Sequence, residues 1–95
     1  MNFNEFNFID PAVPQKFVEL LMGPFEESDG QQIPLTPDMR LMAHILHKVN
    51  FFSSVGEARR NGWDKPIPPG FSKFEVGKGK KMRVIFILAD HPIWH

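Results

Sequence analysis

Eight basic side chains lie between residues 59 and 83, where only Asp64 and Glu75 oppose them. The cations are Arg59, Arg60, Lys65, Lys73, Lys78, Lys80, Lys81 and Arg83. The guanidinium group presents a planar fork of donors that matches phosphate oxygens, and lysines can follow a nucleic-acid backbone without reading its bases. Trp63, Phe71 and Phe74 lie among these cations and can stack on unpaired bases. The pattern predicts a nucleic-acid interface, with RNA as the expected ligand.

A simpler interpretation stays open at this point: a solvated basic face, with the aromatic rings in the core. The net charge is zero, but it is divided very unevenly along the chain. Residues 1–38 carry seven acids against one base, a net −6, whereas residues 39–95 carry ten bases against four acids, a net +6. Such a division indicates either a surface for a polyanion or two halves that neutralise each other.

The histidines are the only candidates for a metal site. His44 and His47 are spaced three apart on a predicted helix, and His91 and His95 lie four apart near the end of the chain. Two such pairs can complete a tetrahedral site, but apolar residues share the helical face and a proline interrupts the second pair. The sequence therefore favours ordinary histidines and predicts no metal site and no cofactor.

Catalytic chemistry has little support in the sequence. No cysteine is present, which excludes disulfides and thiolate nucleophiles. No serine has an obvious paired base, and Gly77-Lys78-Gly79-Lys80 does not precede a helix as a phosphate-binding loop requires. The chain also lacks a signal-peptide pattern and a long apolar run. We therefore expect a cytoplasmic binding protein that is no enzyme.

The residues that position these groups predict an α+β fold of one domain spanning residues 1–95. Residues 1–9 are expected to form an arm or a short edge strand, and residues 24–35 a loop. Helices are predicted over 11–22, with Asp10 as N-cap, and over 37–49, where the apolar spacing is that of a central core helix. In total, two or three short helices should pack on a small antiparallel sheet built around a C-terminal hairpin.

The basic residues fall on the last two predicted elements. Ser54 and Glu57 have the spacing of a capping box, and Asn61-Gly62 provides a left-handed stop, so a short helix is expected over 54–61. Alternating apolar residues on either side of a glycine-bearing turn predict a β-hairpin over 71–88. Its second strand is apolar on both faces, and we expect it to be covered on both sides.

The segment from Ile45 to Ile85 resembles a shortened alpha-L RNA-binding motif, the small domain found at the tail of bacterial tyrosyl-tRNA synthetases. The resemblance rests on Ser53-Ser54-Val55-Gly56-Glu57-Ala58-Arg59-Arg60, and on Val76-Gly77-Lys78-Gly79-Lys80-Lys81 before the last strand. In that family the second helix presents a basic face to RNA. The resemblance implies an RNA-facing role for Arg59, Arg60, Lys78, Lys80 and Lys81.

Two other functions are compatible with the sequence. A protein-interaction module, such as the small inhibitors that phages direct at host proteins, would use an acidic and aromatic surface, with Glu26-Glu27-Ser28-Asp29 as a contact. A component of a larger assembly would add an aromatic N-terminal strand, bearing Phe3, Phe6 and Phe8, to a neighbouring sheet.

Overall fold

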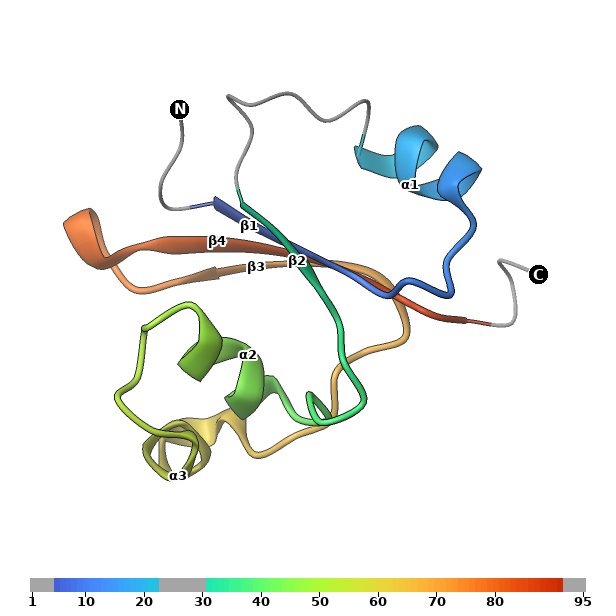
Figure 1. Ribbon diagram of the computed structural model, residues 1–95. Coiled ribbons are helices and arrows are strands. Elements are labelled where there is room, and N and C mark those ends of the chain that lie inside the picture. The colour runs from blue at the N-terminus through green and yellow to red at the C-terminus, as the bar shows by residue number, and fades with distance from the viewer. Residues whose placement is uncertain (1–4, 23–30, 92–95) are drawn as a thin grey trace. The chain divides into compact units, whose positions relative to one another are not determined.

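The computed structural model describes residues 5–22 and 31–91, and its elements confirm the α+β class (Figure 1). The elements are β1 (Glu5–Ile9), α1 (Gln15–Met22), β2 (Gln31–Pro34), α2 (Met42–Lys48), α3 (Val55–Ala58), the wide helical turn η1 (Arg59–Trp63), β3 (Gly70–Val76), the single 3₁₀ turn η2 (Gly79–Lys81) and β4 (Arg83–Ala89). The chain divides into two compact units: a sheet unit, residues 1–35 with 68–95, and a helical unit, residues 36–67. The expectation of one domain stays a prediction.

The sheet unit contains a four-stranded mixed sheet in the order β2-β1-β4-β3. The hairpin is confirmed, because β3 and β4 pair antiparallel from Gly70↔Ala89 to Val76↔Arg83. β1, however, pairs parallel with both β2 and β4. Residues 5–9 therefore form an interior strand, where the sequence predicts an arm or an edge strand. With both backbone edges of β1 occupied, Phe6 and Phe8 lie in a strand that cannot add to a neighbouring sheet; Phe3 lies outside the described residues.

β2 occupies part of the segment that the sequence assigns to a loop. Its four residues carry no alternating apolar pattern, and Pro34 is unfavourable for a strand by propensity. Gln31 and Gln32 pair with Phe6 and Asn7 because the chain returns alongside β1 after α1. The pairing is therefore non-local, and no short window of sequence indicates it.

Helix α1 packs on one face of the sheet, where Val13 and Val18 are buried against Leu88. It begins at Gln15, four residues later than predicted. The Asp10 carboxylate accepts the Ala12 N–H (2.9 Å) and the Asp10 carbonyl accepts the Val13 N–H (3.0 Å), so residues 10–13 form a turn. Asp10 is thus satisfied as a turn residue and does not cap the helix.

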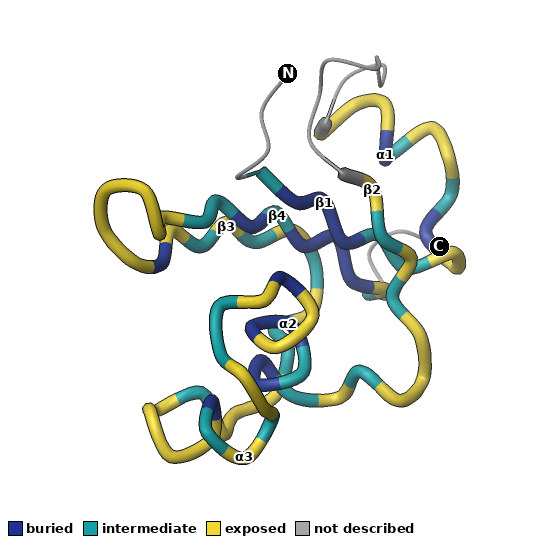
Figure 2. The backbone as a smooth tube through the Cα atoms, turned by 60° about the vertical axis from the view of Figure 1, so that its left-hand side comes forward, coloured by how far each residue is buried: buried dark blue, intermediate teal, exposed yellow. Residues whose placement is uncertain are grey.

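The two faces of the sheet differ in how far they are buried. Strand alternation places Phe8, Ile85 and Ile87 on one face, and all three are fully buried. Figure 2 shows this burial along β1 and β4 in dark blue. On the opposite face α1 covers Leu88, whereas Phe86 is only half-buried. An eight-residue helix spans about 12 Å and a seven-residue strand about 23 Å, so α1 leaves part of this face open.

In the helical unit, α2 begins at Met42, five residues later than predicted. Leu41 is extended and forms an isolated bridge with Pro66, while the Met42 N–H donates to the Lys65 carbonyl (2.8 Å). This pairing holds the preceding residues out of the helix. The central-core prediction agrees with the burial of Met42, Ala43, Ile45 and Leu46.

Residues 36–38, predicted to begin that helix, form a turn. The Thr36 hydroxyl donates to the Asp38 carboxylate, and the Met39 N–H donates to the Thr36 carbonyl (2.9 Å). This hydroxyl holds the pKa of Asp38 below its usual range, because it stabilises the ionised carboxylate.

The start and stop signals of α3 are confirmed. Ser54 Oγ accepts the Glu57 N–H (3.0 Å), and Gly62 adopts the left-handed φ of 95° after Asn61 has left helical values. The Glu57 carboxylate accepts from Ser53 Oγ (2.6 Å) instead of closing the capping box. Among the described residues, no helix is long and apolar enough to cross a membrane.

Removing the cap tests this assignment. We expect Ser54→Ala to lower the free energy of unfolding by about 1 kcal/mol, because the Glu57 N–H loses its acceptor. Urea denaturation followed by circular dichroism measures the change, with Ser72→Ala in β3 as a serine control that removes no helix cap. A loss equal to that of the control would show that Ser54 does not cap α3.

Candidate nucleic-acid interface

The predicted interface residues are divided between the two units. Arg59, Arg60, Trp63 and Lys65 belong to the helical unit, whereas Lys73, Lys78, Lys80, Lys81 and Arg83 belong to the hairpin of the sheet unit. The sequence treats them as a single set because they lie within twenty-five residues of each other. Each unit must therefore be judged as a candidate surface by its own geometry.

The hairpin turn gathers three of the lysines. Gly77 (φ 82°) and Gly79 (φ 59°) take left-handed backbone values, which favours glycine at both positions. The Lys81 N–H donates to the Lys78 carbonyl (3.1 Å), and the Met82 N–H donates to the Gly79 carbonyl (3.2 Å). These bonds order the turn, and Lys78, Lys80 and Lys81 are all exposed on it. No ion pair engages any of the three within residues 5–22 and 31–91.

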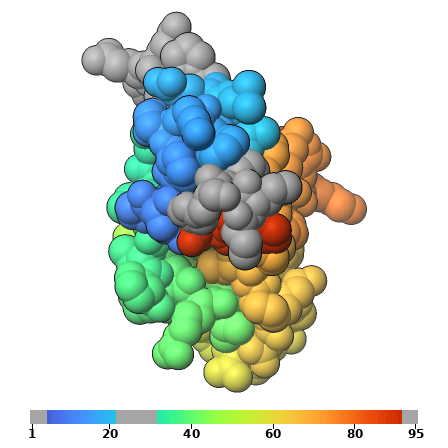
Figure 3. Space-filling model, turned by 90° about the vertical axis from the view of Figure 1, so that its right-hand side faces the viewer, coloured from blue at the N-terminus to red at the C-terminus, as the bar shows by residue number. Residues whose placement is uncertain are grey.

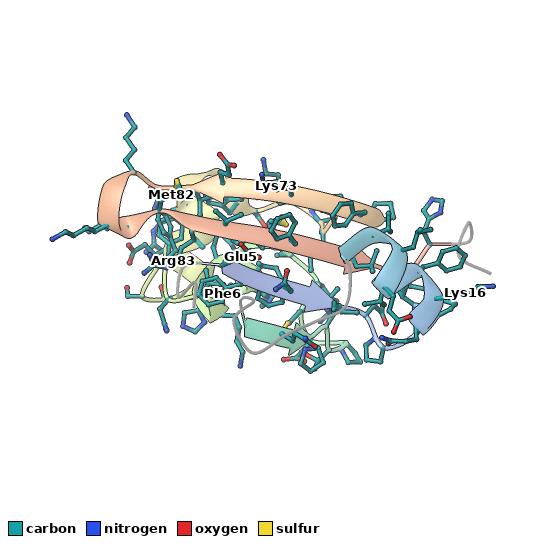
Figure 4. The ribbon with its side chains drawn as sticks, turned by 90° about the horizontal axis from the view of Figure 1, so that it is seen from above. Glu5, Phe6, Lys16, Lys73, Met82 and Arg83 are labelled. Carbon is teal, nitrogen blue, oxygen red and sulfur yellow. The ribbon has the colours of Figure 1, made fainter. Side chains whose placement is uncertain are left out.

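Lys73 and Arg83 lie on opposite faces of the hairpin. Lys73 is opposite Phe86, and Arg83 is opposite Val76, so strand alternation separates their side chains. Lys73 forms an exposed ion pair with Glu75 (3.2 Å), and Arg83 Nη1 donates to the Met82 carbonyl (3.2 Å). Figure 4 shows both residues on the hairpin. One flat ligand cannot contact both side chains from a single side of the sheet.

Two phenylalanines form an aromatic pair on the α1 side of the sheet. The rings of Phe71 and Phe86 are nearly parallel, with an angle of 8° and a centroid distance of 6.2 Å, and Phe71 is 41% exposed. Lys73 Nζ lies 5.7 Å from the Phe86 centroid. Phe74, also predicted to stack on bases, is half-buried on the other face, opposite Ile85.

Sequence reasoning missed Phe86. Its strand is apolar at every position from Val84 to Ala89, which predicts cover on both faces. The expectation holds fully at Leu88, which packs with Val13 and Val18. It holds only in part at Phe86, which is half-buried although Leu21 of α1 lines the same surface hollow. The available signal was the two-residue spacing between Phe86 and Leu88, which places them on one face, together with the short length of α1.

A shallow hollow of about 210 Å³ adjoins the aromatic pair. Its lining residues are Glu5, Asn7, Leu21, Phe71 and Phe86, all from the sheet unit. Asn7 is opposite Phe86 in the β1–β4 register, which places the two side chains on the same face. The hollow thus combines aromatic and aliphatic walls with one carboxylate and one carboxamide.

The cations of the helical unit differ in whether they already contact an acidic or aromatic side chain. Arg59 Nε lies 3.1 Å from the Asp64 carboxylate in an exposed ion pair, and Lys65 Nζ lies 5.2 Å from the Trp63 ring centroid. Arg60 is exposed and lines a surface hollow of about 300 Å³ with Gly56, Arg59 and Asp64. Because exposed ion pairs are weak, Arg59 can exchange Asp64 for a phosphate at little cost.

The candidate metal ligands are not brought together among the described residues. His44 Nδ1 accepts the Leu41 N–H (3.1 Å), His47 is exposed, and His91 belongs to the other unit. His95 lies outside the described residues. Within the described part of the chain no three histidine or acidic side chains are placed to share an ion.

Comparison with known proteins identifies no relative. No protein-family model, no curated protein and no solved structure matches this chain. The resemblance to the alpha-L motif therefore stays a prediction.

Proposed function

We propose that this protein binds RNA, holding the phosphate backbone with the lysines of the β3–β4 turn. The observation that carries the proposal is the exposure of Lys78, Lys80 and Lys81 on one ordered turn. No acid occurs between Val76 and Arg83. Lysines presented in this way release condensed counterions when they meet phosphates, which is the main source of sequence-independent affinity.

The shape of the hairpin supports this role. β3 and β4 extend beyond β1 and β2, so the turn projects from the sheet (Figures 1 and 4). Gly77 and Gly79 allow the backbone to turn at the tip of the hairpin, where the lysine side chains lie. A projecting cationic turn can enter a groove of an RNA duplex or lie along single-stranded RNA. Neither mode of binding requires the β-sheet to change shape.

The helical unit supplies a second set of cations. Arg60 and the weakly paired Arg59 follow α3, and the resemblance to the alpha-L motif implies an RNA-facing role for both. Their planar guanidinium groups suit bidentate phosphate contacts. They are proposed to add affinity to that of the turn.

A salt series tests the proposal. We expect the purified protein to bind a labelled RNA hairpin and an unrelated single strand, with an affinity that falls steeply as salt rises. Lys80→Ala should reduce the slope of log Kd against log salt by about 0.7 on the single strand, because one phosphate contact is lost. Lys16→Ala is the matched control, since Lys16 is exposed on α1 at the other end of the sheet (Figure 4).

Two results would contradict the proposal. Negligible binding at low salt would exclude nucleic acid as the ligand and favour the protein-interaction alternative, whose acidic contact at residues 26–29 lies outside the described residues. Equal slopes for Lys80→Ala and Lys16→Ala would show that the turn is not the phosphate contact.

A further inference from the structure

We propose that the hollow beside Phe71 and Phe86 holds an unpaired base of single-stranded RNA, stacked on these rings. The inference rests on the proposed function, because phosphate contacts at the turn deliver the strand to the sheet. It goes beyond that function by naming single-stranded RNA as the preferred form and a second contact surface. Both surfaces belong to the sheet unit, so one strand can pass from the turn along β3 and β4.

The aromatic pair is the first support. Phe71 lies on edge strand β3 with 41% of its surface exposed, and Phe86 beside it is half-buried. The exposed part of Phe71, whose ring is nearly parallel to that of Phe86, offers a π surface on which a base can stack, whatever its identity. Other exposed apolar groups on α1, such as Leu20 at 76%, are aliphatic and offer no such surface. Figure 3 shows the outer side of α1 in blue.

The polar groups of the hollow favour a base over a phosphate. Glu5 lines it with a carboxylate, which repels phosphate but can accept from a base N–H group. Asn7 also lines the hollow, but it is only 4% exposed, so its carboxamide presents a small part of its donor and acceptor surface to the edge of a base. Lys78, Lys80 and Lys81 lie on the β3–β4 turn, whereas Lys73 Nζ lies 5.7 Å from the Phe86 ring centroid and is paired with Glu75. The phosphate contacts proposed at the turn are therefore separate from the base contact, and Lys73 is a cation beside the aromatic pair.

The geometry also selects against duplex RNA. A base in a duplex is stacked on its neighbours above and below, so its face is not available to Phe71 or Phe86. Extracting it would cost the energy of unpairing and unstacking. A single strand avoids most of this cost, and the hollow is expected to discriminate between the two forms while the turn lysines bind both.

The test compares Phe71→Leu with the wild-type protein on two probes. The probes are a single-stranded oligoadenylate about ten nucleotides long and a blunt-ended RNA duplex. We expect Phe71→Leu to raise Kd for the single strand about 5- to 150-fold, since it removes one stacking surface, and to leave the salt slope unchanged. The Kd for the duplex should change by less than about twofold. Phe71→Trp, which keeps an aromatic face, should restore single-strand binding, and Leu20→Ala is the control for a lost apolar side chain.

A spectroscopic measurement makes the outcome independent of folding effects in the variants. In the wild-type protein, the ring-proton resonances of Phe71 and Phe86 should shift when the oligoadenylate is added and stay in place when the duplex is added. Unshifted resonances, or equal single-strand affinity for Phe71→Leu and wild type, would overturn this inference while leaving salt-dependent RNA binding intact. Absence of any RNA binding by the wild type would instead overturn the proposed function itself, and this inference with it.

Discussion

Replacing Lys78, Lys80 and Lys81 together with glutamine is expected to weaken binding to single-stranded RNA roughly 500-fold in about 50 mM salt. Three lost phosphate contacts should lower the slope of log Kd against log salt by about 2. Glutamine keeps a long polar side chain without the charge, and all three positions are exposed on the turn, so the fold should be unaffected. Fluorescence anisotropy with a labelled single strand across a salt series measures both quantities.

The matched control removes the same amount of charge elsewhere. Lys16, Arg40 and Lys48 are also exposed, and their joint replacement by glutamine gives the same net charge. We expect this variant to lose less than about tenfold in affinity, because only the long-range field of the protein changes. Similar losses in the two triple variants would mean that overall charge, and not the hairpin turn, determines binding.

Truncation of Phe8 is expected to have the largest effect on folding. Phe8 has no exposed surface, and it lies in β1 between two parallel neighbours. Phe8→Ala should lower the free energy of unfolding by about 3–5 kcal/mol, through lost burial and the cavity left behind. Because small domains are stable by only about 5–15 kcal/mol, much of the protein should be unfolded at moderate urea concentrations.

Urea denaturation followed by far-ultraviolet circular dichroism measures this loss. Phe8→Leu, which keeps most of the buried volume, should cost less than about 1.5 kcal/mol. Leu20→Ala should change stability by less than about 0.5 kcal/mol, because Leu20 is 76% exposed. A Phe8→Ala protein as stable as wild type would show that β1 does not form the interior of the sheet.

Local signals in the sequence determined much of the secondary structure. The hairpin, the cap at Ser54 and the stop at Gly62 all occur as predicted. Each depends on residues within a few positions of one another: a side-chain oxygen three residues before an amide, or glycines where the backbone needs a left-handed φ. Such interactions form the same way in many tertiary contexts, which is why the sequence alone is sufficient.

Helix starts were less predictable, because each start signal had a competing use. Asp10 stabilises a turn before α1, and Thr36 and Asp38 form a turn before α2. Both turns are local, whereas the bridge of Leu41 with Pro66, which also precedes α2, joins residues twenty-five apart in the chain. A capping pattern indicates that a side chain can accept a hydrogen bond from a backbone N–H group at that position. It does not determine that a helix begins at that residue.

For the candidate site, the sequence by itself determined that exposed lysines would stand on a glycine-bearing turn. Only the tertiary structure decided which other residues accompany them. Parallel pairing of β1 with β4 brings Asn7 beside Phe86, and the strand register separates Lys73 from Arg83. Beside Leu21 of the short α1, Phe71 stays 41% exposed and Phe86 is half-buried. The physical reason is that charge and turn chemistry are properties of neighbouring residues. The placement of Asn7 beside Phe86 depends on a pairing between segments about eighty residues apart, and the faces of Lys73 and Arg83 depend on the register of the hairpin.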